Sequence, residues 1–231
     1  MTDSLSGSTW TELPDRPIVL VPLGSCEQHG PHLPFTTDTD IAEAVALAAV
    51  PGIEASTGIR VVVAPPLAYG ASGEHQAFPG TVSIGHDALR SVLVELIRSM
   101  STWATRIVLI NGHGGNATTV TAVVDKMRYE RHDVMAISCA LETSTDAHAG
   151  SDETSLMLFL RQNTVRVDSL EQGNITPLHA LLPDLMAQGV RPISPNGVLG
   201  DPRTASRDIG EAAFANLVES VVGEVCLNYR D

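Results

Sequence analysis

Short apolar, β-branched runs alternate with longer segments of helical periodicity, and this alternation is the feature that most constrains the fold. The apolar runs cover residues 18–21, 61–64, 107–110 and 134–140. Apolar residues three or four positions apart mark segments 41–50, 87–103, 117–128, 153–161 and 209–229 as helical. Continuous apolar strands joined through helices predict an α/β fold, with a mostly parallel sheet that helices cover on both faces.

The chain of 231 residues is long enough to bury one sizeable core, and we expect residues 1–231 to form a single domain. One long stretch, residues 172–206, is rich in proline, glycine and asparagine. Because loops of such length inside a domain are usually functional, we expect this stretch to lie near a site rather than at a domain boundary.

Composition and charge limit the partners. Hydrophobic residues make up 43% of the chain and charged residues 18%, which is typical of a globular protein. The net charge of −13, with no basic run to offset it, argues against nucleic-acid binding. No apolar stretch reaches the length of a membrane span, and the first residues do not form a leader. The three cysteines do not form a disulfide framework, so we expect a soluble protein of the reducing cytoplasm.

Carboxylates and imidazoles are concentrated directly after the first apolar run. Such groups are costly to place beside a core unless they hold something charged. Glu27 and His29 are two positions apart, so on an extended segment their side chains point the same way. Asp38 precedes a helix and can either cap its first turn or join Glu27 and His29 at a metal. Thr39 and Asp40 are also available as caps, which favours the metal.

His113 follows the third apolar run, in a glycine-rich turn. Ligands in open α/β sheets bind beyond the carboxyl ends of the strands. We therefore expect His113 at the same edge of the sheet as Glu27, His29 and Asp38. One alternative is a histidine that bonds only to nearby backbone. Another is an anion-binding turn, for which the signal is weak because neither a P-loop nor a dinucleotide fingerprint is present.

His148 and Glu153 add an imidazole and a carboxylate at the start of another helical segment. Glu153 can be a first-turn acid favoured by the helix dipole, or a further metal ligand. Five side chains would suffice for two divalent ions that share one bridging carboxylate and keep positions open for water: Glu27, His29, Asp38, His113 and Glu153. Mixed nitrogen and oxygen ligands suit zinc, Fe(II) and manganese alike.

Another polar turn follows the second apolar run. We expect Ser72 and His75, together with Asn116 of the glycine-rich turn, to contact the substrate, and Glu74 to be a catalytic carboxylate. The alternative is a polar loop without a role in chemistry. Cys26 lies among the expected ligands, but no histidine at a defined spacing marks it as a nucleophile.

At these residues the chain resembles the creatininase family of metal-dependent amidohydrolases. The resemblance rests on PLGSCEQHGPHLP (22–34), NGHGGN (111–116) and HAGSDETS (148–155). It implies a three-layer α/β/α fold, a homo-oligomer that is often a hexamer, and two metal ions bridged by Asp38. Creatininase has a carboxylate two residues past the histidine of the second motif, where this chain has Gly115. The resemblance makes Glu153 the best candidate to replace it.

Two further motifs, YGASGEHQAFPGT (69–81) and GVLGDPRTA (197–205), are similar to the mycofactocin-system branch of this family. Members of that branch are peptidases of a modified precursor peptide. They release its cyclised, Val-Tyr-derived C-terminal unit by amide hydrolysis. The resemblance therefore implies a peptidase in the biosynthesis of a peptide-derived redox cofactor, with the modified precursor peptide as its substrate.

The expected mechanism uses hydroxide held by the two ions, because metal binding lowers the pKa of water to roughly 7. His148 is expected to protonate the leaving amine or to stabilise the oxyanion. One alternative within the family is hydrolysis of a small cyclic amide or formamide. In a different class, the alternative is a non-enzymatic anion- or nucleotide-binding module built on residues 112–116. Thiol chemistry at Cys26 is a third alternative.

Overall fold

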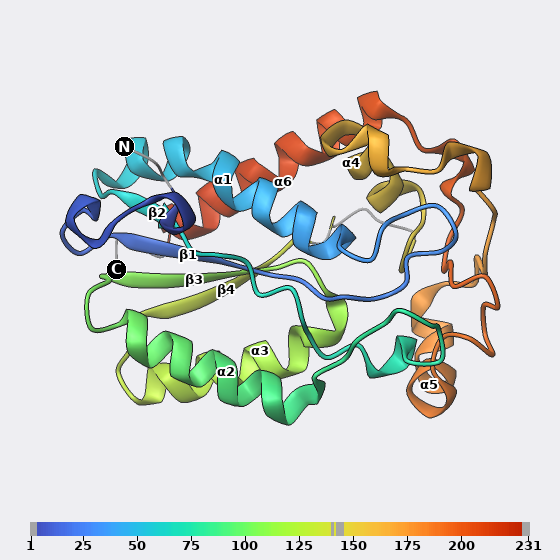
Figure 1. Ribbon diagram of the computed structural model, residues 1–231, viewed down its shortest axis with the longest axis horizontal. Helices are drawn as coiled ribbons and strands as arrows, with labels where there is room; N and C mark the ends of the chain where they lie inside the picture. The colour runs from blue at the N-terminus through green and yellow to red at the C-terminus, as the bar shows by residue number, and fades with distance from the viewer. Residues whose placement is uncertain (1–3, 140, 142–145, 228–231) are drawn as a thin grey trace.

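The computed structural model describes residues 4–139, 141 and 146–227 and has a four-stranded sheet at its centre (Figure 1). The strands β1 (Ile18–Leu23), β2 (Val61–Val63), β3 (Arg106–Asn111) and β4 (Val134–Ser138) lie in the order β2-β1-β3-β4. Every neighbouring pair is parallel. The predicted parallel sheet is therefore confirmed, and residue 140, at the end of the fourth predicted strand, lies outside the described residues.

Helices cover both faces of this sheet, as the alternation predicts. One face carries α1 (Thr37–Thr57), α4 (Ser151–Leu160) and α6 (Arg207–Leu227), and the other carries α2 (Gly85–Met100) and α3 (Ala117–Tyr129) (Figure 1). The three-layer α/β/α architecture is thus confirmed. The last two residues of the helix predicted to end at 229 fall outside the described part of the chain.

Alternate residues of each strand enter two separate cores. Ile18 and Leu20 of β1 pack in the core beneath α1 and α6, whereas Val19 and Val21 pack against α2 and α3. All four are buried. A strand buried on both faces has no solvent side, which is why its sequence reads as a continuous apolar run rather than an alternating one.

The long stretch after α4 contains a helix that the sequence does not predict, α5 (Leu178–Gln188). Pro177 precedes it and Pro183 lies inside it, and proline is a signal for the end of a helix because it lacks a donor N–H. The helix ends at Gly189, and the next residue, Val190, donates its N–H to Glu74 O at 2.9 Å. The stretch therefore supports the turn that carries Glu74.

The loops that follow the strands stay together beyond the edge of the sheet. Gly24 N–H donates to Leu67 O at 3.0 Å, and Gly112 N–H donates to Leu23 O at 2.8 Å. These two bonds tie the segment after β1 to those after β2 and β3. The predicted ligand-bearing segments consequently meet at the carboxyl ends of the strands, where open α/β sheets bind ligands.

Short 3₁₀ helices complete the described structure: η1 (Leu5–Gly7), η2 (Trp10–Glu12), η3 (Gly73–His75), η4 (Gly114–Asn116), η5 (Gln162–Thr164), η6 (Val167–Ser169) and η7 (Pro202–Thr204). None of the helices in the described ranges combines the length and the apolar character needed to cross a membrane.

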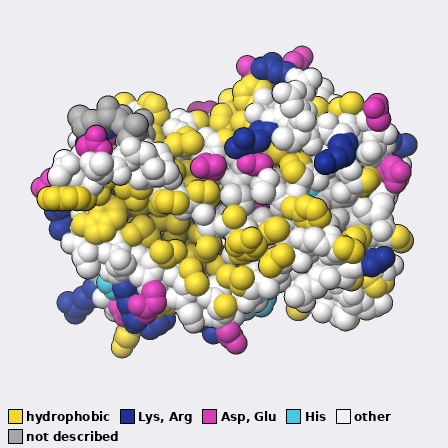
Figure 2. All heavy atoms as spheres, in the orientation of Figure 1, with side chains coloured by type: hydrophobic (Ala, Val, Ile, Leu, Met, Phe, Trp, Pro, Cys, Tyr) yellow, Lys and Arg dark blue, Asp and Glu magenta, His cyan; other side chains and the backbone are white. Residues whose placement is uncertain are grey.

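Hydrophobic side chains gather on the molecular face drawn in Figure 2. Large apolar residues with substantial exposure occur on several elements of the protein, among them Leu47 of α1, Val92 and Leu96 of α2, and Leu182 and Met186 of α5. Scattered exposed apolar residues are normal, whereas large contiguous apolar patches mark interaction surfaces.

Candidate metal centre

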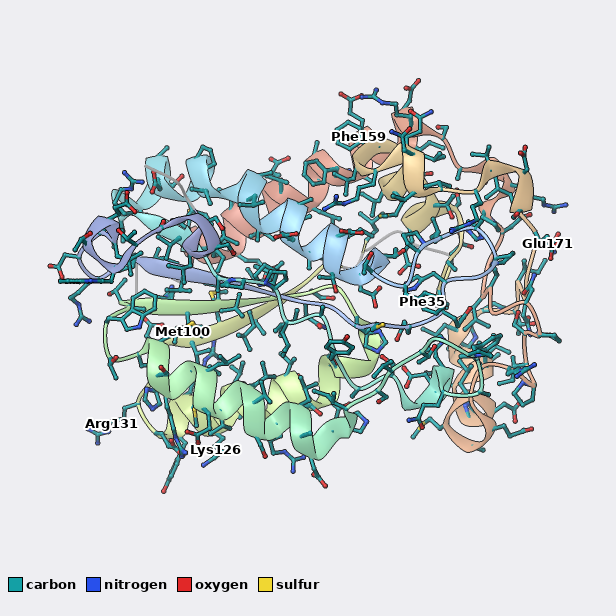
Figure 3. All side chains as sticks on the ribbon, viewed as in Figure 1. Phe35, Met100, Lys126, Arg131, Phe159 and Glu171 are labelled. Carbon is teal, nitrogen blue, oxygen red and sulfur yellow. The ribbon has the colours of Figure 1, made fainter. Side chains whose placement is uncertain are left out.

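The loop after β1 places Glu27 and His29 at the carboxyl edge of the sheet. The loop folds back on itself, because Glu27 N–H donates to Phe35 O at 3.2 Å (Figure 3 labels Phe35). His29 Nδ1 donates to Glu27 O at 3.1 Å, which leaves His29 Nε2 to face Asp38 Oδ1 at 3.0 Å. Glu27 is fully buried and His29 nearly so. Both side chains thus point into one enclosed space, as their spacing predicts.

Asp38 lies in the first turn of α1 but does not cap it. The N-cap residue of α1 is Thr36, and the helix has no side-chain cap hydrogen bond. Asp38 instead accepts a hydrogen bond from Ser25 Oγ at 2.6 Å, and its other oxygen faces His29. The loop after β1 therefore holds the carboxylate with both oxygens at the site, which suits a bridging ligand.

His113 reaches the same space from the turn after β3. Its Nε2 lies 3.2 Å from Glu27 Oε2, and its Nδ1 lies 3.4 Å from Asp38 Oδ2. Its Nε2 is also 3.1 Å from the backbone oxygen of Ala71. The alternative of a histidine bonded only to backbone does not describe this ring, because it contacts two buried carboxylates.

His148 and Glu153 close the opposite side. His148 Nδ1 lies 3.7 Å from Glu27 Oε1, and its ring packs 4.3 Å from that of His29 between centroids. Glu153 Oε2 lies 3.9 Å from His29 Nε2 and accepts a hydrogen bond from Ala149 N–H at 2.6 Å. The Glu153 side chain is 27% exposed, whereas the other carboxylates at the centre are almost fully buried.

Glu27 provides the test of whether these residues fit a metal. Neither of its carboxylate oxygens has a hydrogen-bond partner among the described residues, although both are buried. A buried carboxylate whose oxygens accept no hydrogen bond is unfavourable, and a bound cation would satisfy it. The described residues contain three overlapping groups of possible ligands, and within each group the ligand atoms lie within 4.8 Å of one another. The groups are Glu27, His29 and His148; Glu27, Asp38 and His113; and His29, Asp38 and Glu153. The donor set fits divalent ions.

Protons occupy this environment when no cation does. Burial alone would lower the pKa of His29, but Asp38, Glu153 and Glu27 outweigh it and raise the pKa to about 10. Burial is likewise outweighed at His113, where Glu27 and Asp38 raise the pKa to about 9. Burial would raise the pKa of Glu27, yet the neighbouring imidazoles, His113 foremost, hold that pKa well below its ordinary value.

Glu74 occupies the space next to Gly115. A Cβ atom at Gly115 would lie 2.6 Å from Glu74 Oε1, 2.4 Å from His113 Nε2 and 2.5 Å from Ala71 O. Glu74 Oε1 itself lies 3.7 Å from His113 Nε2. The carboxylate that enters the region beside residue 115 therefore comes from Glu74, while Glu153 lies on the side of His29.

The other expected substrate contacts differ in accessibility. Ser72 is fully buried, with Oγ 3.4 Å from His113 Nε2. Asn116 is also fully buried, and its amide accepts from Ala71 N–H at 2.9 Å and donates to Gly24 O at 3.1 Å. These bonds make Asn116 a tie between three loops. Cys26 Sγ is directed to Gly80 O at 3.8 Å.

His75 joins the centre as a neutral ring. Its Nε2 lies 3.5 Å from Glu27 Oε1, and burial together with His148 lowers its pKa to about 2. Sequence reasoning missed the side chain beside it, Gln28, whose amide nitrogen lies 2.9 Å from His75 Nδ1. Gln28 sits between Glu27 and His29 in the first motif, and a strict alternation of side chains would have turned it away from the site. His32 is buried and bonds to Thr154 Oγ1 at 2.9 Å.

The sequence matches the creatininase family model, described as creatinine amidohydrolase, over residues 6–225. The protein belongs to the creatininase family. It is 50% identical over 209 residues to the mycofactocin precursor peptide peptidase of Mycolicibacterium smegmatis, an alignment that covers 90% of this chain and 84% of the relative. It is 27% identical to the creatinine amidohydrolase of Pseudomonas putida, with 94% of each chain covered.

Solved structures of creatininase share the fold along the whole chain. A mutant creatininase complexed with creatine superposes with a TM-score of 0.82 at 26% identity and covers 100% of both chains. A mutant creatininase of Zn-Zn type gives a TM-score of 0.81 at 25% identity, again over 100% of both chains. The family expected from the three motifs is thus confirmed.

Proposed function

We propose that this protein is a metal-dependent peptidase that hydrolyses an amide bond in the modified mycofactocin precursor peptide. The product would be the cyclised, Val-Tyr-derived C-terminal unit, released during biosynthesis of the redox cofactor. The observation that carries the chemistry is the buried carboxylate of Glu27, which accepts no hydrogen bond from the described residues and lies among imidazoles and carboxylates. The substrate is supported by the 50% identity to the Mycolicibacterium smegmatis peptidase.

The proposed ligands are Glu27, His29, Asp38, His113 and Glu153, with Asp38 between two ions per subunit. When bound, the ions would activate water and polarise the amide carbonyl. Solved creatininases described as Zn-Zn type and Mn support zinc and manganese, and Fe(II) accepts the same mixed ligands.

His148 is the proposed proton carrier. Its Nε2 lies 2.8 Å from the backbone oxygen of Gln28, so Nε2 must hold the ring proton and donate it there. Burial lowers the pKa of His148 and favours the neutral ring. Its Nδ1 is consequently unprotonated and faces the centre. It can take a proton from the attacking water and then give it to the leaving amine nitrogen as the C–N bond breaks.

Glu74 is the second proposed catalytic side chain. It belongs to none of the three candidate ligand groups, and its side chain is 32% exposed. A carboxylate so placed beside His113 can accept a hydrogen bond from the attacking water and orient it. Ser72 and His75 line the same space as proposed substrate contacts, with Asn116 holding their loop.

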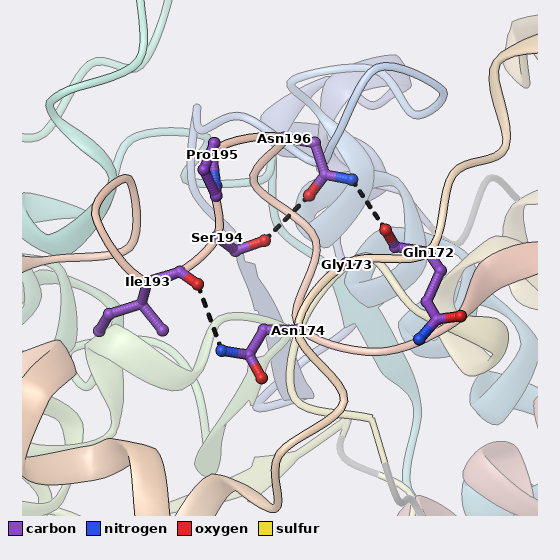
Figure 4. A pocket seen from close by; sticks show the side chains of 7 residues that line it. All are labelled: Gln172, Gly173, Asn174, Ile193, Ser194, Pro195 and Asn196. Atoms are coloured by element: carbon purple, nitrogen blue, oxygen red, sulfur yellow. Dashed lines mark hydrogen bonds between the residues drawn. The ribbon is translucent and has the colours of Figure 1, made fainter.

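A cavity of about 490 Å³ offers a place for the peptide (Figure 4). It is lined by residues of the long stretch between α4 and α6, four of which have an amide or hydroxyl side chain: Gln172, Gly173, Asn174, Ile193, Ser194, Pro195 and Asn196. The residue that follows this lining, Gly197, bonds through its backbone oxygen to Gln28 at 3.0 Å. A peptide in the cavity would thus lie next to the wall of the metal centre.

We further propose a cytoplasmic, single-domain homo-oligomer, with hexamers as the family resemblance implies. The exposed apolar side chains of α1, α2 and α5 support an interface between copies. Neither a nucleic acid nor a membrane is a proposed partner, in keeping with the net charge of −13.

Metal content measured together with hydrolysis of the modified peptide tests the proposal. Purified protein should hold a divalent metal in stoichiometric amount, lose activity with a chelator and regain it with zinc, manganese or Fe(II). Glu27→Gln should lose both metal and activity, while the exposed Glu95→Gln should lose neither. Cleavage of creatinine or a formamide in place of the peptide would support the small-amide alternative. Protein without metal would support the anion-binding module.

A further inference from the structure

We infer that Gln28 is a positioning residue: it fixes the ring tautomer of His75, so that a neutral imidazole N–H is presented to the catalytic space. This inference rests on the proposed function, because the role of that N–H is to contact the amide being cleaved. It follows from the hydrogen bonds that orient the buried amide of Gln28.

The orientation of the Gln28 amide is determined by its backbone partners. Gly30 N–H lies 2.9 Å from Gln28 Oε1, and a backbone N–H can only donate. Gly197 O lies 3.0 Å from Gln28 Nε2, and a carbonyl oxygen can only accept. Both contacts assign the same end of the amide as nitrogen, and Gln28 is buried.

The two protons on that nitrogen then have assigned acceptors. One goes to Gly197 O. The other goes to His75 Nδ1 at 2.9 Å, since His148 Nε2, 3.1 Å away, needs its own proton for the bond to Gln28 O. His75 Nδ1 must therefore be unprotonated, and the proton of the neutral ring must sit on Nε2.

The N–H of His75 points toward the metal centre. His75 Nε2 lies 3.5 Å from Glu27 Oε1, and the ring is buried and packs 4.4 Å from that of His148 between centroids. His75 nevertheless belongs to none of the three candidate ligand groups. With one nitrogen bonded to Gln28 and the other protonated, the ring has no lone pair for a cation. It is a donor instead.

A neutral imidazole N–H at this place suits the carbonyl oxygen of the scissile amide, which gains negative charge as water attacks. Donors aimed at that oxygen lower the barrier without a change in protonation. Gln28 also bonds to Gly197, which follows the residues that line the peptide cavity. A peptide bound in the cavity can therefore influence the orientation of the His75 N–H through the side chain of Gln28.

Nitrogen NMR of the zinc-loaded protein, labelled on its eight histidines, measures the tautomer directly. We expect His75, assigned by its loss in His75→Gln, to carry its proton on Nε2. Protonation of Nδ1, or the shift of a zinc-bound nitrogen, would overturn the inference. The measurement needs no substrate, so it separates failure of this inference from failure of the proposed function.

Activity tests the role of the donor. Gln28→Glu can only accept at His75 Nδ1, so it should move the proton to Nδ1 and lower kcat about 100- to 1000-fold with zinc content and KM little changed. The exposed Gln76→Glu makes the same charge change one residue from His75 and should leave kcat unaltered. Unaltered kcat in Gln28→Glu despite a moved proton would contradict the role.

A second pair keeps the test decisive if Gln28→Glu does not fold. His75→Gln retains an amide N–H close to the position of the ring Nε2, whereas His75→Leu does not. We expect His75→Gln to keep at least about tenfold more kcat than His75→Leu at equal zinc content, as for the loss of one oriented partner. Equal kcat in the two variants would show that no donor is needed there.

Discussion

At the scale of single residues, the centre is defined by the buried carboxylate of Glu27, which lies among imidazoles but accepts no hydrogen bond from the described residues. Each imidazole near it, in contrast, also bonds to the backbone or to another side chain. Backbone carbonyls hold His29, His113 and His148 in fixed orientations, which is how proteins usually arrange metal-binding histidines. The carboxylate of Glu27 is therefore the group that a bound cation would satisfy.

Gly115 is required because the segment from Ala71 to Glu74 fills the space beside it. Gly115→Ala would place Cβ within 2.6 Å of Ala71 O, His113 Nε2 and Glu74 Oε1, so His113 and the turn must move. We expect kcat/KM to fall at least about 100-fold, since small displacements at a reacting centre cost that much. Gly114→Ala meets no atom within 4 Å and is the matched control. Equal activity in the two variants would contradict the crowding seen at Gly115.

Glu74→Gln separates a catalytic carboxylate from a metal ligand. The substitution keeps the shape of the side chain and removes its charge. Because Glu74 lies outside the candidate ligand groups, zinc content should stay at the wild-type level while kcat falls about 100-fold or more. Elemental analysis and steady-state kinetics on the same preparation check both parts. Loss of zinc would make Glu74 a ligand, and unchanged kcat would remove it from the mechanism.

At the scale of elements, the sequence predicts the strands, and the meeting of the loops that follow them, better than it predicts the irregular segments. The four apolar runs and the motifs after them place Glu27, His29, Asp38 and His113 at one edge, because parallel strands end together. The helix α5 was not predicted, since Pro177 before it and Pro183 inside it obscure its pattern. Gln28 was not predicted either, because its role depends on contacts with residues distant in the sequence.

The crossing of α4 and α6 depends on one small residue. A Cβ at Gly210 would lie 1.9 Å from Ser155 O, so Gly210→Ala must push α6 away from α4. We expect the free energy of unfolding to fall by about 1–3 kcal/mol, as for other overpacked contacts. Gly223→Ala in the same helix meets no atom within 4 Å and should raise that free energy by about 0.5–1 kcal/mol. Urea unfolding measures the free energy of unfolding of both variants. Destabilisation by Gly223→Ala would show that helix propensity does not determine the effect of this substitution.

At the scale of the whole molecule, the two layers of helices leave the carboxyl edge of the sheet free for the centre. The long stretch between α4 and α6 covers part of that edge through α5, which packs against η3. A largely buried sheet thus supports the segments that carry the proposed ligands, while the segment that would meet the peptide belongs to a less regular part of the chain. This division is common in enzymes, where function sits on loops that a stable scaffold positions.

The stability of the metal-free protein should fall at alkaline pH, and bound metal should prevent this loss. The pKa values of His29, about 10, and His113, about 9, are raised above about 6.5, the value expected in the unfolded chain. Their contribution to the free energy of unfolding is fully present below pH 6.5. It falls by about 1.4 kcal/mol per pH unit for each proton as the pH rises from 6.5, and it is lost once the pH passes the folded-state pKa values of about 9 and 10.

Two other histidines have lowered pKa values and make the protein less stable as the pH falls. The pKa values of His32, about 4, and His75, about 2, are lowered, so protonation of the unfolded chain weakens the fold below pH 6.5. Urea unfolding of chelator-treated protein from pH 5 to 10 should therefore give a maximum near pH 6.5. Zinc-loaded protein should keep its stability up to pH 9, because the metal replaces the protons on His29 and His113. Identical alkaline profiles with and without zinc would show that these two histidines do not bind the metal.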